Sequence, residues 1–371
     1  MFMRLLERMG YTKEEASWIL YDVGNSAQVL TTCTVIFPLL IAYITPGDSS
    51  VYVGWANTVY GVLLAVMSPI LGTVADYKGM KMKLFRFFLY IGIVGGFALA
   101  LPFIDYRMAL VIFVIAMVGY NGSIIFYDAF IVDVCEDDER VDKVSAAGYA
   151  WGYIGSTLPF LIFVIPFAIV TLVGDVQIGL FLLTYRWGCG LTMAMAVLWW
   201  LIYSRPILKN VRQRQYHEPV QHVVKESFRR LWNTFRNVRR NRNIFCLSYF
   251  FYIDCVNTVI KMAVSLATEM GVSDVMSLVL VIVINLFCFP CAIWFGKLVK
   301  RFGSKPMLIV SILGYIGIII CGSLIPVNVN FIWVVGILIG MFQGGIQATS
   351  RSYFTRLIPD KEDSNEYFGF F

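Results

Sequence analysis

The sequence predicts an all-α integral membrane protein, and three observations support this fold class. Of the 371 residues, 58% are hydrophobic and only 15% are charged, whereas a soluble globular domain has about 25% charged residues. Ten apolar runs are long enough to cross a membrane as helices, since a hydrocarbon core about 30 Å thick needs about 20 helical residues. The runs are also continuous, unlike the alternating segments of about ten residues in a membrane β-barrel.

Each apolar run defines one expected transmembrane helix. The stretch before the first run mixes acidic with basic residues and has no apolar region that ends in small residues, so it is not expected to be a cleaved signal peptide. The first helix itself is expected to target the chain. The expected spans are Trp18–Ile44, Val51–Val74, Phe85–Ile104, Met108–Val132, Ser145–Val173, Thr184–Tyr203, Ile244–Ala267, Met276–Leu298, Pro306–Ile325 and Phe331–Ser350.

The distribution of Lys and Arg predicts the orientation. With the N-terminus in the cytoplasm, the basic residues fall in cytoplasmic segments or at the helix ends that face them, except for Arg107, Arg186 and Lys261. Cytoplasmic loops of membrane proteins carry such an excess of Lys and Arg. We therefore expect a cytoplasmic N-terminus.

The longest polar stretch divides the expected helices into six before it and four after it. It is rich in Lys and Arg, as the positive-inside bias predicts for a cytoplasmic connection. We expect an N-terminal six-helix bundle at residues 1–204, a basic cytoplasmic linker at 205–243 and an incomplete C-terminal bundle of four helices at 244–371.

The two halves share a polar motif in their first expected helix. In each half an Asp is followed three positions later by Asn and then by Ser or Thr, and a Tyr precedes the Asp closely. Many transporters are built from such duplicated units around a central site. The motif residues are Asp22, Asn25 and Ser26 in the first half and Asp254, Asn257 and Thr258 in the second.

The halves also share a short basic loop between their second and third expected helices. It reads GTVADYKGMKMK at 72–83 and GKLVKRFGSKP at 296–306. We expect the first glycine of each copy, Gly72 or Gly296, to end a helix, and the second, Gly79 or Gly303, to take a positive φ. The lysines that follow are expected on the cytoplasmic side.

The first loop resembles the signature that major facilitator superfamily transporters carry at this place. It departs from that signature at Tyr77 and Met80, where basic residues are usual, and in the second copy Lys300 replaces the acidic residue. WILYDVGNSA, GYAWGYIGS and GGIQATSRSYFTRLIP are then similar to the vacuole-effluxer-like branch of the superfamily, which is related to the autophagy-associated exporter of amino acids. The signature positions that match are Gly72, Asp76, Gly79 and Lys81, with Gly296, Arg301 and Gly303 in the second copy.

The resemblance implies a major-facilitator-type fold of twelve helices in two six-helix bundles. Ten are expected here, so we expect the chain to end before the last two helices. It also implies secondary transport of a small solute by alternating access, with amino acids as the leading substrate class. The bacterial breadth of the family favours the plasma membrane, with the vacuolar membrane as the alternative.

Charged groups within the expected helices are candidate sites, because an ionised side chain at mid-membrane costs at least about 2.5–3.5 kcal/mol on insertion scales. Asp254, Asn257 and Lys261 stand on one helix face and form either a substrate-sensitive pair or a structural ion pair. Asp22 and Asn25 present a second polar face, which either lines the transport path or lies at the membrane interface.

Two further helices carry polar candidates. Asp128 is a candidate proton acceptor, whereas Asp133 and the acidic run after it are expected on the solvated cytoplasmic surface. Gln343, Gln347 and Arg351 form a stripe at fourfold spacing, which either binds a carboxylate or anchors at the headgroups. The glycines Gly336, Gly340 and Gly344 follow the same spacing and predict close helix packing.

A proton-coupled secondary transporter is therefore the leading hypothesis, with the lipid bilayer, a small solute and protons as partners. An enzyme is not expected, because the only histidines, His217 and His222, lie in the linker and no metal-ligand spacing or phosphate-binding loop occurs. No metal, cofactor or nucleic-acid partner is predicted. A non-transporting receptor or scaffold and a lipid translocator are the alternatives, and the oligomeric state is open.

Overall fold

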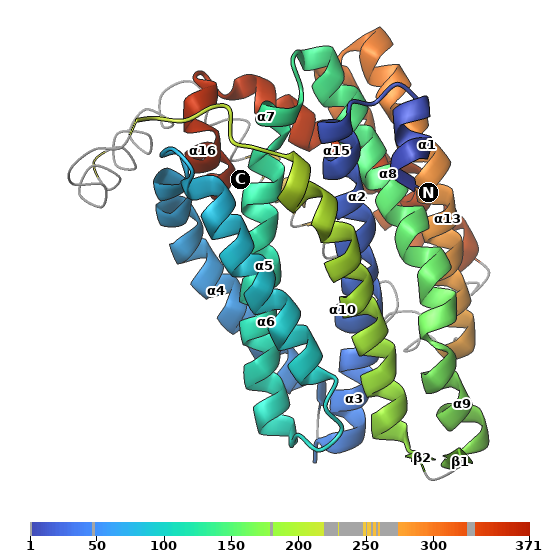
Figure 1. Cartoon of the computed structure of the whole chain (residues 1–371). Coiled ribbons are helices and arrows are strands. Elements are labelled where there is room, and N and C mark those ends of the chain that lie inside the picture. Colours follow the sequence, from blue (N-terminus) through green and yellow to red (C-terminus); the bar gives the residue numbers. More distant parts are fainter. Residues whose placement is uncertain are drawn as a thin grey trace. The chain divides into compact units, whose positions relative to one another are not determined.

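The computed structural model describes residues 2–46, 49–178, 181–218, 274–324 and 331–371, with 229, 248–249, 251–253, 255–256 and 259. This part of the chain is almost entirely helical (Figure 1). Most of the predicted span Ile244–Ala267 lies outside the described residues, and so do the candidates Asp254, Asn257 and Lys261.

Long apolar helices occur where the hydropathy pattern predicts them. The described residues contain eight helices that are long and apolar enough to cross a membrane, or nine when the bent pair α8 and α9 is one span. Each of the predicted spans other than Ile244–Ala267 corresponds to one of these. They are α2 (Lys13–Gln28), η1 (Val29–Ile36) and α3 (Phe37–Ile44) as one span, α4 (Ser49–Ala75), α5 (Met80–Leu99), α6 (Tyr106–Ala129) continued by α7 (Ile131–Val134), α8 (Asp138–Phe163) with α9 (Ile165–Val173), α10 (Tyr185–Asn210), α13 (Asp274–Phe302), α14 (Ser304–Gly322) and α15 (Phe331–Leu357).

Short elements connect or flank the long helices. Strands β1 and β2 pair antiparallel after α9. The short elements are α1 (Phe2–Arg8), β1 (Val176–Ile178), β2 (Phe181–Leu183), η2 (Lys361–Asp363) and α16 (Ser364–Phe370).

Two local features shape the first span. It begins with a capping box, in which Thr12 Oγ1 accepts the Glu15 N–H and Glu15 Oε2 accepts the Thr12 N–H, satisfying two N–H groups that have no partner within the helix. Its middle, η1, is a π-helix. Pro38, in the first turn of α3, has no N–H to donate, so an α-helical hydrogen bond from this position is not available.

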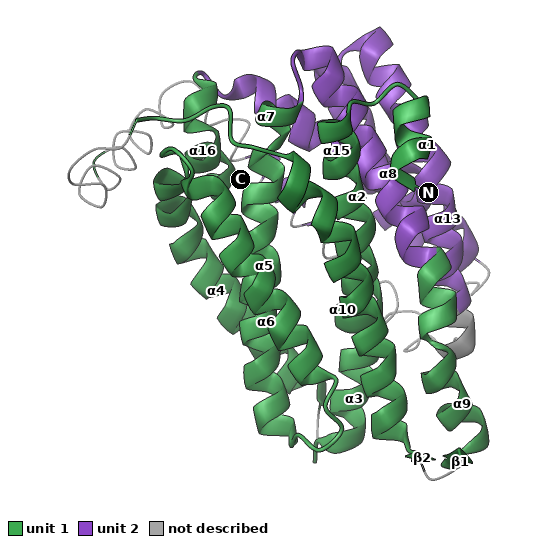
Figure 2. Ribbon diagram, viewed as in Figure 1, with its two compact units in different colours: residues 1–134, 158–232, 360–371 green, residues 135–157, 233–359 purple. Residues whose placement is uncertain are grey.

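The described residues divide into two compact units (Figure 2). Unit 1 comprises residues 1–134, 158–232 and 360–371, and unit 2 comprises 135–157 and 233–359. The predicted division at 1–204, 205–243 and 244–371 stays a prediction.

Within unit 1, α5 packs on α6, α2 on α10, and α4 on α16. Aromatic side chains fill the space between α2, α5 and α6. Trp18, Tyr21, Phe85 and Tyr127 are all buried, and the Tyr127 ring stacks on Trp18 with centroids 4.4 Å apart. Such aromatic contacts stabilise by about 0.5–1.5 kcal/mol beyond the burial of area.

Within unit 2, α15 packs on α13 and α14. The predicted close packing of its glycines is confirmed. A Cβ at Gly340 would lie 2.8 Å from Phe287 Cβ, and a Cβ at Gly344 would lie 2.9 Å from Ala292 Cβ. Side chains at these positions would therefore force α13 and α15 apart.

Candidate functional site

A buried carboxylate on the first membrane helix is the centre of the candidate site in unit 1. Asp22 is only 6% exposed. Its Oδ2 accepts a hydrogen bond from the Tyr127 hydroxyl at 2.9 Å, and its Oδ1 lies 3.4 Å from Asn25 Nδ2. Both donors are neutral groups, so they hold the carboxylate without adding a charge.

Tyr127 is itself held in place from α2. Trp18 Nε1 donates to the Tyr127 carbonyl at 2.8 Å, and the two rings stack. One turn away, the hydroxyls of Tyr21 and Ser123 are 2.7 Å apart. These contacts fix α2 against α6 at the level of Asp22, because each buried polar group has a partner on the facing helix.

The neighbours of Asp22 extend this network. Asn25 is buried, and its Oδ1 lies 3.5 Å from the Tyr120 hydroxyl. Asp128 is half-buried on α6, next to Tyr127 in the chain. The sequence motif therefore marks a site on α2 whose other half is a set of tyrosines on α6.

A second polar cluster lies within unit 2. Arg351 is 2% exposed, and its guanidinium donates to Ser145 Oγ and to the Ser145 carbonyl, each at 3.1 Å. It also lies over the Tyr149 ring, 4.3 Å from the centroid, a favourable cation–π geometry. The guanidinium thus lies inside the unit rather than among lipid headgroups.

The rest of the predicted stripe on α15 is less enclosed. Gln347 Oε1 accepts a hydrogen bond from the Tyr153 hydroxyl at 2.8 Å. Gln343 and Gln347 are both half-buried. Ser145, Tyr149 and Tyr153 stand four residues apart on α8, so one face of α8 meets the stripe on α15.

The loop between α4 and α5 binds the N-terminus of α16. Asp76 Oδ1 accepts the backbone N–H and the side-chain amide of Asn365, each at 2.8 Å, and Oδ2 accepts the Glu366 N–H at 3.2 Å. A carboxylate at a helix N-terminus satisfies free N–H groups and complements the helix dipole. Asp76 is fully buried by these contacts.

The glycines of the two loops are only partly as predicted. Gly79 and Gly303 take positive φ angles of 72° and 85°, as expected. The expectation that Gly72 and Gly296 end helices is wrong, because α4 continues to Ala75 and α13 to Phe302. Both instead lie at close contacts, since a Cβ on Gly72 would meet the Asn365 carbonyl oxygen at 2.3 Å and a Cβ on Gly296 would meet Ala146 Cβ at 2.8 Å.

The placement of Asp133 on a solvated surface is also wrong. Asp133 and Lys81 are fully buried at their side chains and form a 2.7 Å ion pair. The other oxygen of Asp133 accepts the backbone N–H groups of Arg214 and Gln215, at 2.6 and 2.9 Å. Asp133 looked solvated because its partners are distant in the sequence, whereas the acidic run after it, Glu136–Glu139, is exposed as expected.

Among the described residues, the ionic contacts of the second loop lie at the surface. Lys300, which replaces the acidic residue, pairs with Glu139 at the surface of unit 2. Arg301 is exposed and lies over the Phe302 ring. The second glycines of the two loops share a positive φ but differ in ψ, which is 0° at Gly79 and 159° at Gly303, and the loops differ in their ionic contacts.

The model of a family described as vacuole effluxer Atg22 like matches residues 45–371. The chain belongs to this family. A Bacillus subtilis (strain 168) protein described as an uncharacterized MFS-type transporter, YxiO, is 36% identical over 370 residues, which cover 97% of this chain and 84% of the relative. The resemblance inferred from the sequence is confirmed, and the chain is of the transporter class rather than an enzyme.

Solved structures confirm the predicted fold class of this vacuole effluxer-like protein. The human organic anion transporter MFSD10 (TETRAN) matches with a TM-score of 0.69 at 12% identity, covering 96% of this chain and 88% of its own. The proton:xylose symporter XylE, bound to 6-bromo-6-deoxy-D-glucose, matches with a TM-score of 0.65 at 11% identity. The match covers 96% of this chain and 84% of the symporter chain. At such identities the likeness shows the fold alone, that of a multi-pass transporter of the major facilitator superfamily.

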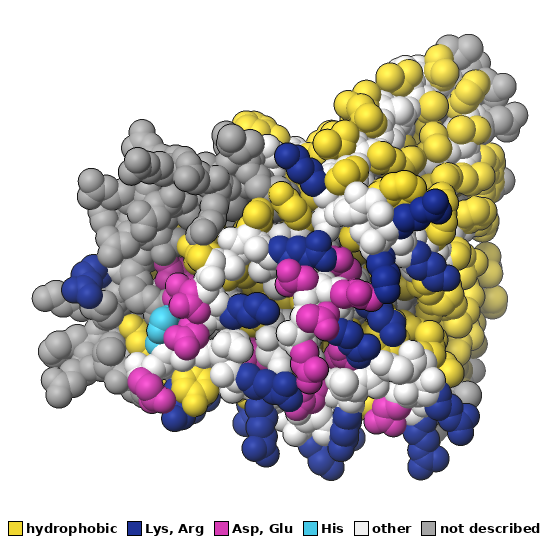
Figure 3. All heavy atoms as spheres, turned by 90° about the horizontal axis from the view of Figure 1, so that it is seen from above, with side chains coloured by type: hydrophobic (Ala, Val, Ile, Leu, Met, Phe, Trp, Pro, Cys, Tyr) yellow, Lys and Arg dark blue, Asp and Glu magenta, His cyan; other side chains and the backbone are white. Residues whose placement is uncertain are grey.

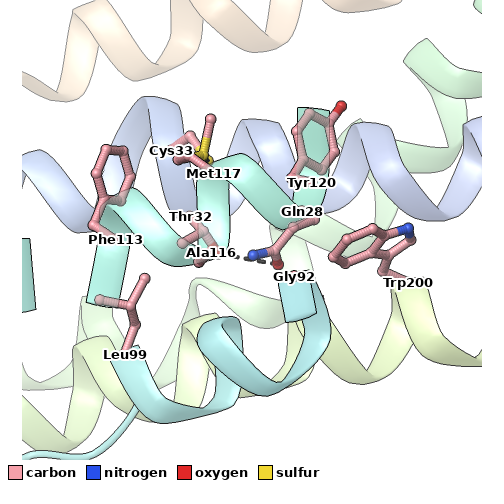
Figure 4. A pocket seen from close by; sticks show the side chains of 10 residues that line it. All are labelled: Gln28, Thr32, Cys33, Gly92, Leu99, Phe113, Ala116, Met117, Tyr120 and Trp200. Carbon is pink, nitrogen blue, oxygen red and sulfur yellow. Dashed lines mark hydrogen bonds between the residues drawn. The ribbon is translucent and has the colours of Figure 1, made fainter. Parts of the chain in front are cut away.

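The vacuole effluxer-like chain also has a small pocket in unit 1, one helical turn beyond Asn25 (Figure 4). It is lined by groups from α2, η1, α5, α6 and α10, among them Gln28, Tyr120 and Trp200. Thr32 Oγ1 donates to Gln28 Oε1 at 3.1 Å inside it. The pocket adds polar groups next to the Asp22 network.

Sequence reasoning missed several residues of both clusters. Tyr127, Ser145, Tyr149 and Tyr153 received no site role, although the last three stand at helical spacing within one expected span. That spacing was the available signal, because polar groups at i and i+4 share a helix face. Gln28 follows the Asp22 motif by one turn and carried the same signal.

Proposed function

We propose that this chain is a proton-coupled secondary transporter in which Asp22 carries the coupling proton. The observation behind this proposal is the burial of Asp22 on a membrane helix, with a tyrosine hydroxyl and an amide as its donors. A hydroxyl donates to a carboxylate and can instead accept from a carboxylic acid. The same contacts therefore serve both protonation states of Asp22.

Substrate binding can drive such a cycle only if the two orientations bind the substrate with different free energy. Amino acids are the proposed substrates, since they carry an ammonium and a carboxylate. Within unit 2, the guanidinium of Arg351 is buried. A guanidinium is well suited to a carboxylate because it offers paired donors in one plane.

The same proposal gives the loop Gly72–Lys83 a conformational role. Asp76 binds the N-terminus of α16, and Lys81 pairs with Asp133. These contacts stabilise one arrangement of unit 1, and breaking them leaves buried charges without partners, at a cost of several kcal/mol. Together with Asp254, Asn257 and Lys261, the polar stripe Gln343–Arg351 is assigned to the transport path.

Orientation and location are part of the proposal. The excess of Lys and Arg in the segments on one side supports a cytoplasmic N-terminus. The plasma membrane is the proposed location.

Flux through liposomes tests the proposal directly. The purified chain is reconstituted, a pH gradient is imposed, and uptake of labelled amino acids is followed for the parent, Asp22→Asn and Asp175→Asn. Asp175 is exposed in the turn before β1, so its variant controls for the loss of one carboxylate. We expect gradient-driven uptake that Asp22→Asn abolishes and Asp175→Asn retains.

A non-transporting receptor or scaffold is the class that the flux measurement must separate from this proposal. Absence of flux for amino acids, sugars and peptides from well-folded protein would favour that class. Transfer of labelled lipid between leaflets under the same conditions would favour a lipid translocator.

A further inference from the structure

The chain leaving α10 runs along the α4–α5 loop as an extended strap, which we define as residues 211–218. The His217 N–H donates to the Asp76 carbonyl at 2.9 Å, and the Lys78 N–H donates to the His217 carbonyl at 3.1 Å. Gln213 Oε1 accepts the Gly79 N–H at 2.9 Å. Backbone hydrogen bonds thus fix the strap to the loop at the position of His217.

The side chain of His217 reaches from the strap to η2. Its Nε2 lies 2.7 Å from Asp363 Oδ1, and its Nδ1 lies 3.2 Å from Glu362 Oε2. The imidazole is 31% exposed, so protons exchange with it directly. Figure 3 shows the histidine in cyan beside acidic side chains in magenta.

Other charged groups surround this contact. From the loop, Asp76 contributes a carboxylate that lies with those of Asp363 and Glu366 within 4.8 Å. Lys78 and Glu218 pair at 3.2 Å beside the histidine backbone, and this hydrogen bond raises the pKa of the Lys78 ammonium. Two carboxylates contact the imidazole nitrogens, and the buried Tyr77 ring on the loop faces the imidazole with centroids 6.5 Å apart.

The two ring contacts cannot both be hydrogen bonds of a neutral histidine. A neutral imidazole has one N–H donor and one acceptor nitrogen, whereas an imidazolium has two donors. Only the protonated ring can therefore donate to Asp363 from Nε2 and also form an ion pair with Glu362 through Nδ1. Loss of the proton places a lone pair opposite one carboxylate and removes the positive charge.

We propose that His217 is a pH-sensitive clasp, which holds η2 and α16 on the α4–α5 loop when protonated and loosens them when neutral. Histidine is the side chain whose unperturbed pKa places its charge change between about pH 5 and 8. Its consequence for transport rests on the proposed function: acidification on the side of the strap would favour the arrangement in which α16 is docked.

The accessibility of Ser364 reports on the clasp without any substrate. Ser364 begins α16, is fully buried and lies 3.2 Å from Lys81 Nζ at its hydroxyl. In full-length Ser364→Cys protein, the rate of maleimide labelling measures release of α16. Protein without this substitution gives the background from the native cysteines.

Two variants of His217 fix the limits of the response. His217→Gln removes the titratable charge, and His217→Arg keeps a permanent one. Rates are compared at the same pH, so the pH dependence of the thiolate is common to all variants. At pH 6 we expect the His217 protein to label about twofold to fivefold more slowly than His217→Gln, the range of an ion pair near the surface.

At pH 8 the two rates should converge, while His217→Arg stays slow at both pH values. Glu362→Gln, on the other side of the clasp, should reduce the difference seen at pH 6. Equal rates for His217 and His217→Gln at pH 6, or a ratio that does not change with pH, would overturn the proposal. Failure of transport in liposomes would not affect this measurement, and a pH-independent labelling ratio would leave the transport proposal intact.

Discussion

The hydroxyl of Tyr127 donates a 2.9 Å hydrogen bond to the carboxylate of Asp22, so a tyrosine on α6 holds the acidic group of α2. Both side chains are buried within unit 1. The contact joins the motif repeated in the two halves to a helix that the motif does not include. It also provides the means to test the role of the carboxylate without removing it.

Tyr127→Phe removes this donor and retains the ring that stacks on Trp18. Hydrogen bonds to charged groups contribute about 1.5–3 kcal/mol, so we expect a lower thermal midpoint in detergent and reduced gradient-driven uptake. Tyr90→Phe is the matched control, because Tyr90 is exposed on α5. Identical midpoints and uptake for the two variants would show that the hydroxyl has no part in the site.

The buried pair Lys81–Asp133 predicts a strong and coupled effect on stability. Lys81→Met leaves the Asp133 charge buried, and losing one member of a buried pair costs about 3–5 kcal/mol. Adding Asp133→Asn removes that charge and keeps an oxygen for the two backbone donors, so the double variant should recover part of the loss. The thermal midpoints of the two single variants and of the double variant form a double-mutant cycle, which measures the interaction energy between the two side chains.

Lys78→Met is the control for these stability measurements, because Lys78 pairs with Glu218 at the surface. We expect no measurable change in the midpoint. Additive effects of the Lys81 and Asp133 substitutions would contradict the buried pair.

The close packing at Gly340 predicts that adding a single methyl group there destabilises unit 2. In Gly340→Ala the new Cβ would meet Phe287 Cβ at 2.8 Å and the Ile284 carbonyl oxygen at 3.0 Å. Overpacking of this kind costs about 1–3 kcal/mol. Gly317→Ala on α14 has no neighbour within 4 Å and should be neutral or stabilising, since Ala favours helix over Gly by up to about 1 kcal/mol. Equal midpoints for both variants would refute close packing at Gly340.

The positive φ of Gly79 predicts that replacing it destabilises the protein through backbone strain and not through side-chain clashes. Its φ is 72° and no atom lies within 4 Å of an added Cβ, so Gly79→Ala should cost about 1–2 kcal/mol through left-handed strain alone. Gly79→Asn should cost less, because Asn tolerates this conformation. Thermal midpoints of the two variants give the comparison, and an Ala variant as stable as the parent would contradict the assigned geometry.

The sequence was sufficient to predict the membrane helices and the family. Hydrophobic length sets a membrane span locally, so runs such as Tyr106–Val134 could be recognised without tertiary information. The positive φ of Gly79 and Gly303 followed from the glycine pattern of each loop. These properties depend on neighbours in the chain.

The contacts of the loop and of the candidate site could not be derived in this way. Asp133 and Ser364 bury the ammonium of Lys81, and both are distant from it in the sequence. Gly72 looked like a helix end because its reason for being glycine, the Asn365 carbonyl, lies near the other end of the chain. The π-helix η1 has no periodicity that distinguishes it from an α-helix in an apolar run.

Two modes of transport by Asp22→Asn protein, exchange and gradient-driven accumulation, test whether Asp22 carries the coupling proton. Exchange of labelled for unlabelled solute at equal concentrations needs solute binding and the change between inward-facing and outward-facing states. Accumulation driven by a pH gradient also needs the coupling proton. We expect Asp22→Asn to retain exchange and lose accumulation, and Asp175→Asn to retain both. Accumulation by Asp22→Asn at the rate of the parent would contradict the assignment of the coupling proton to Asp22.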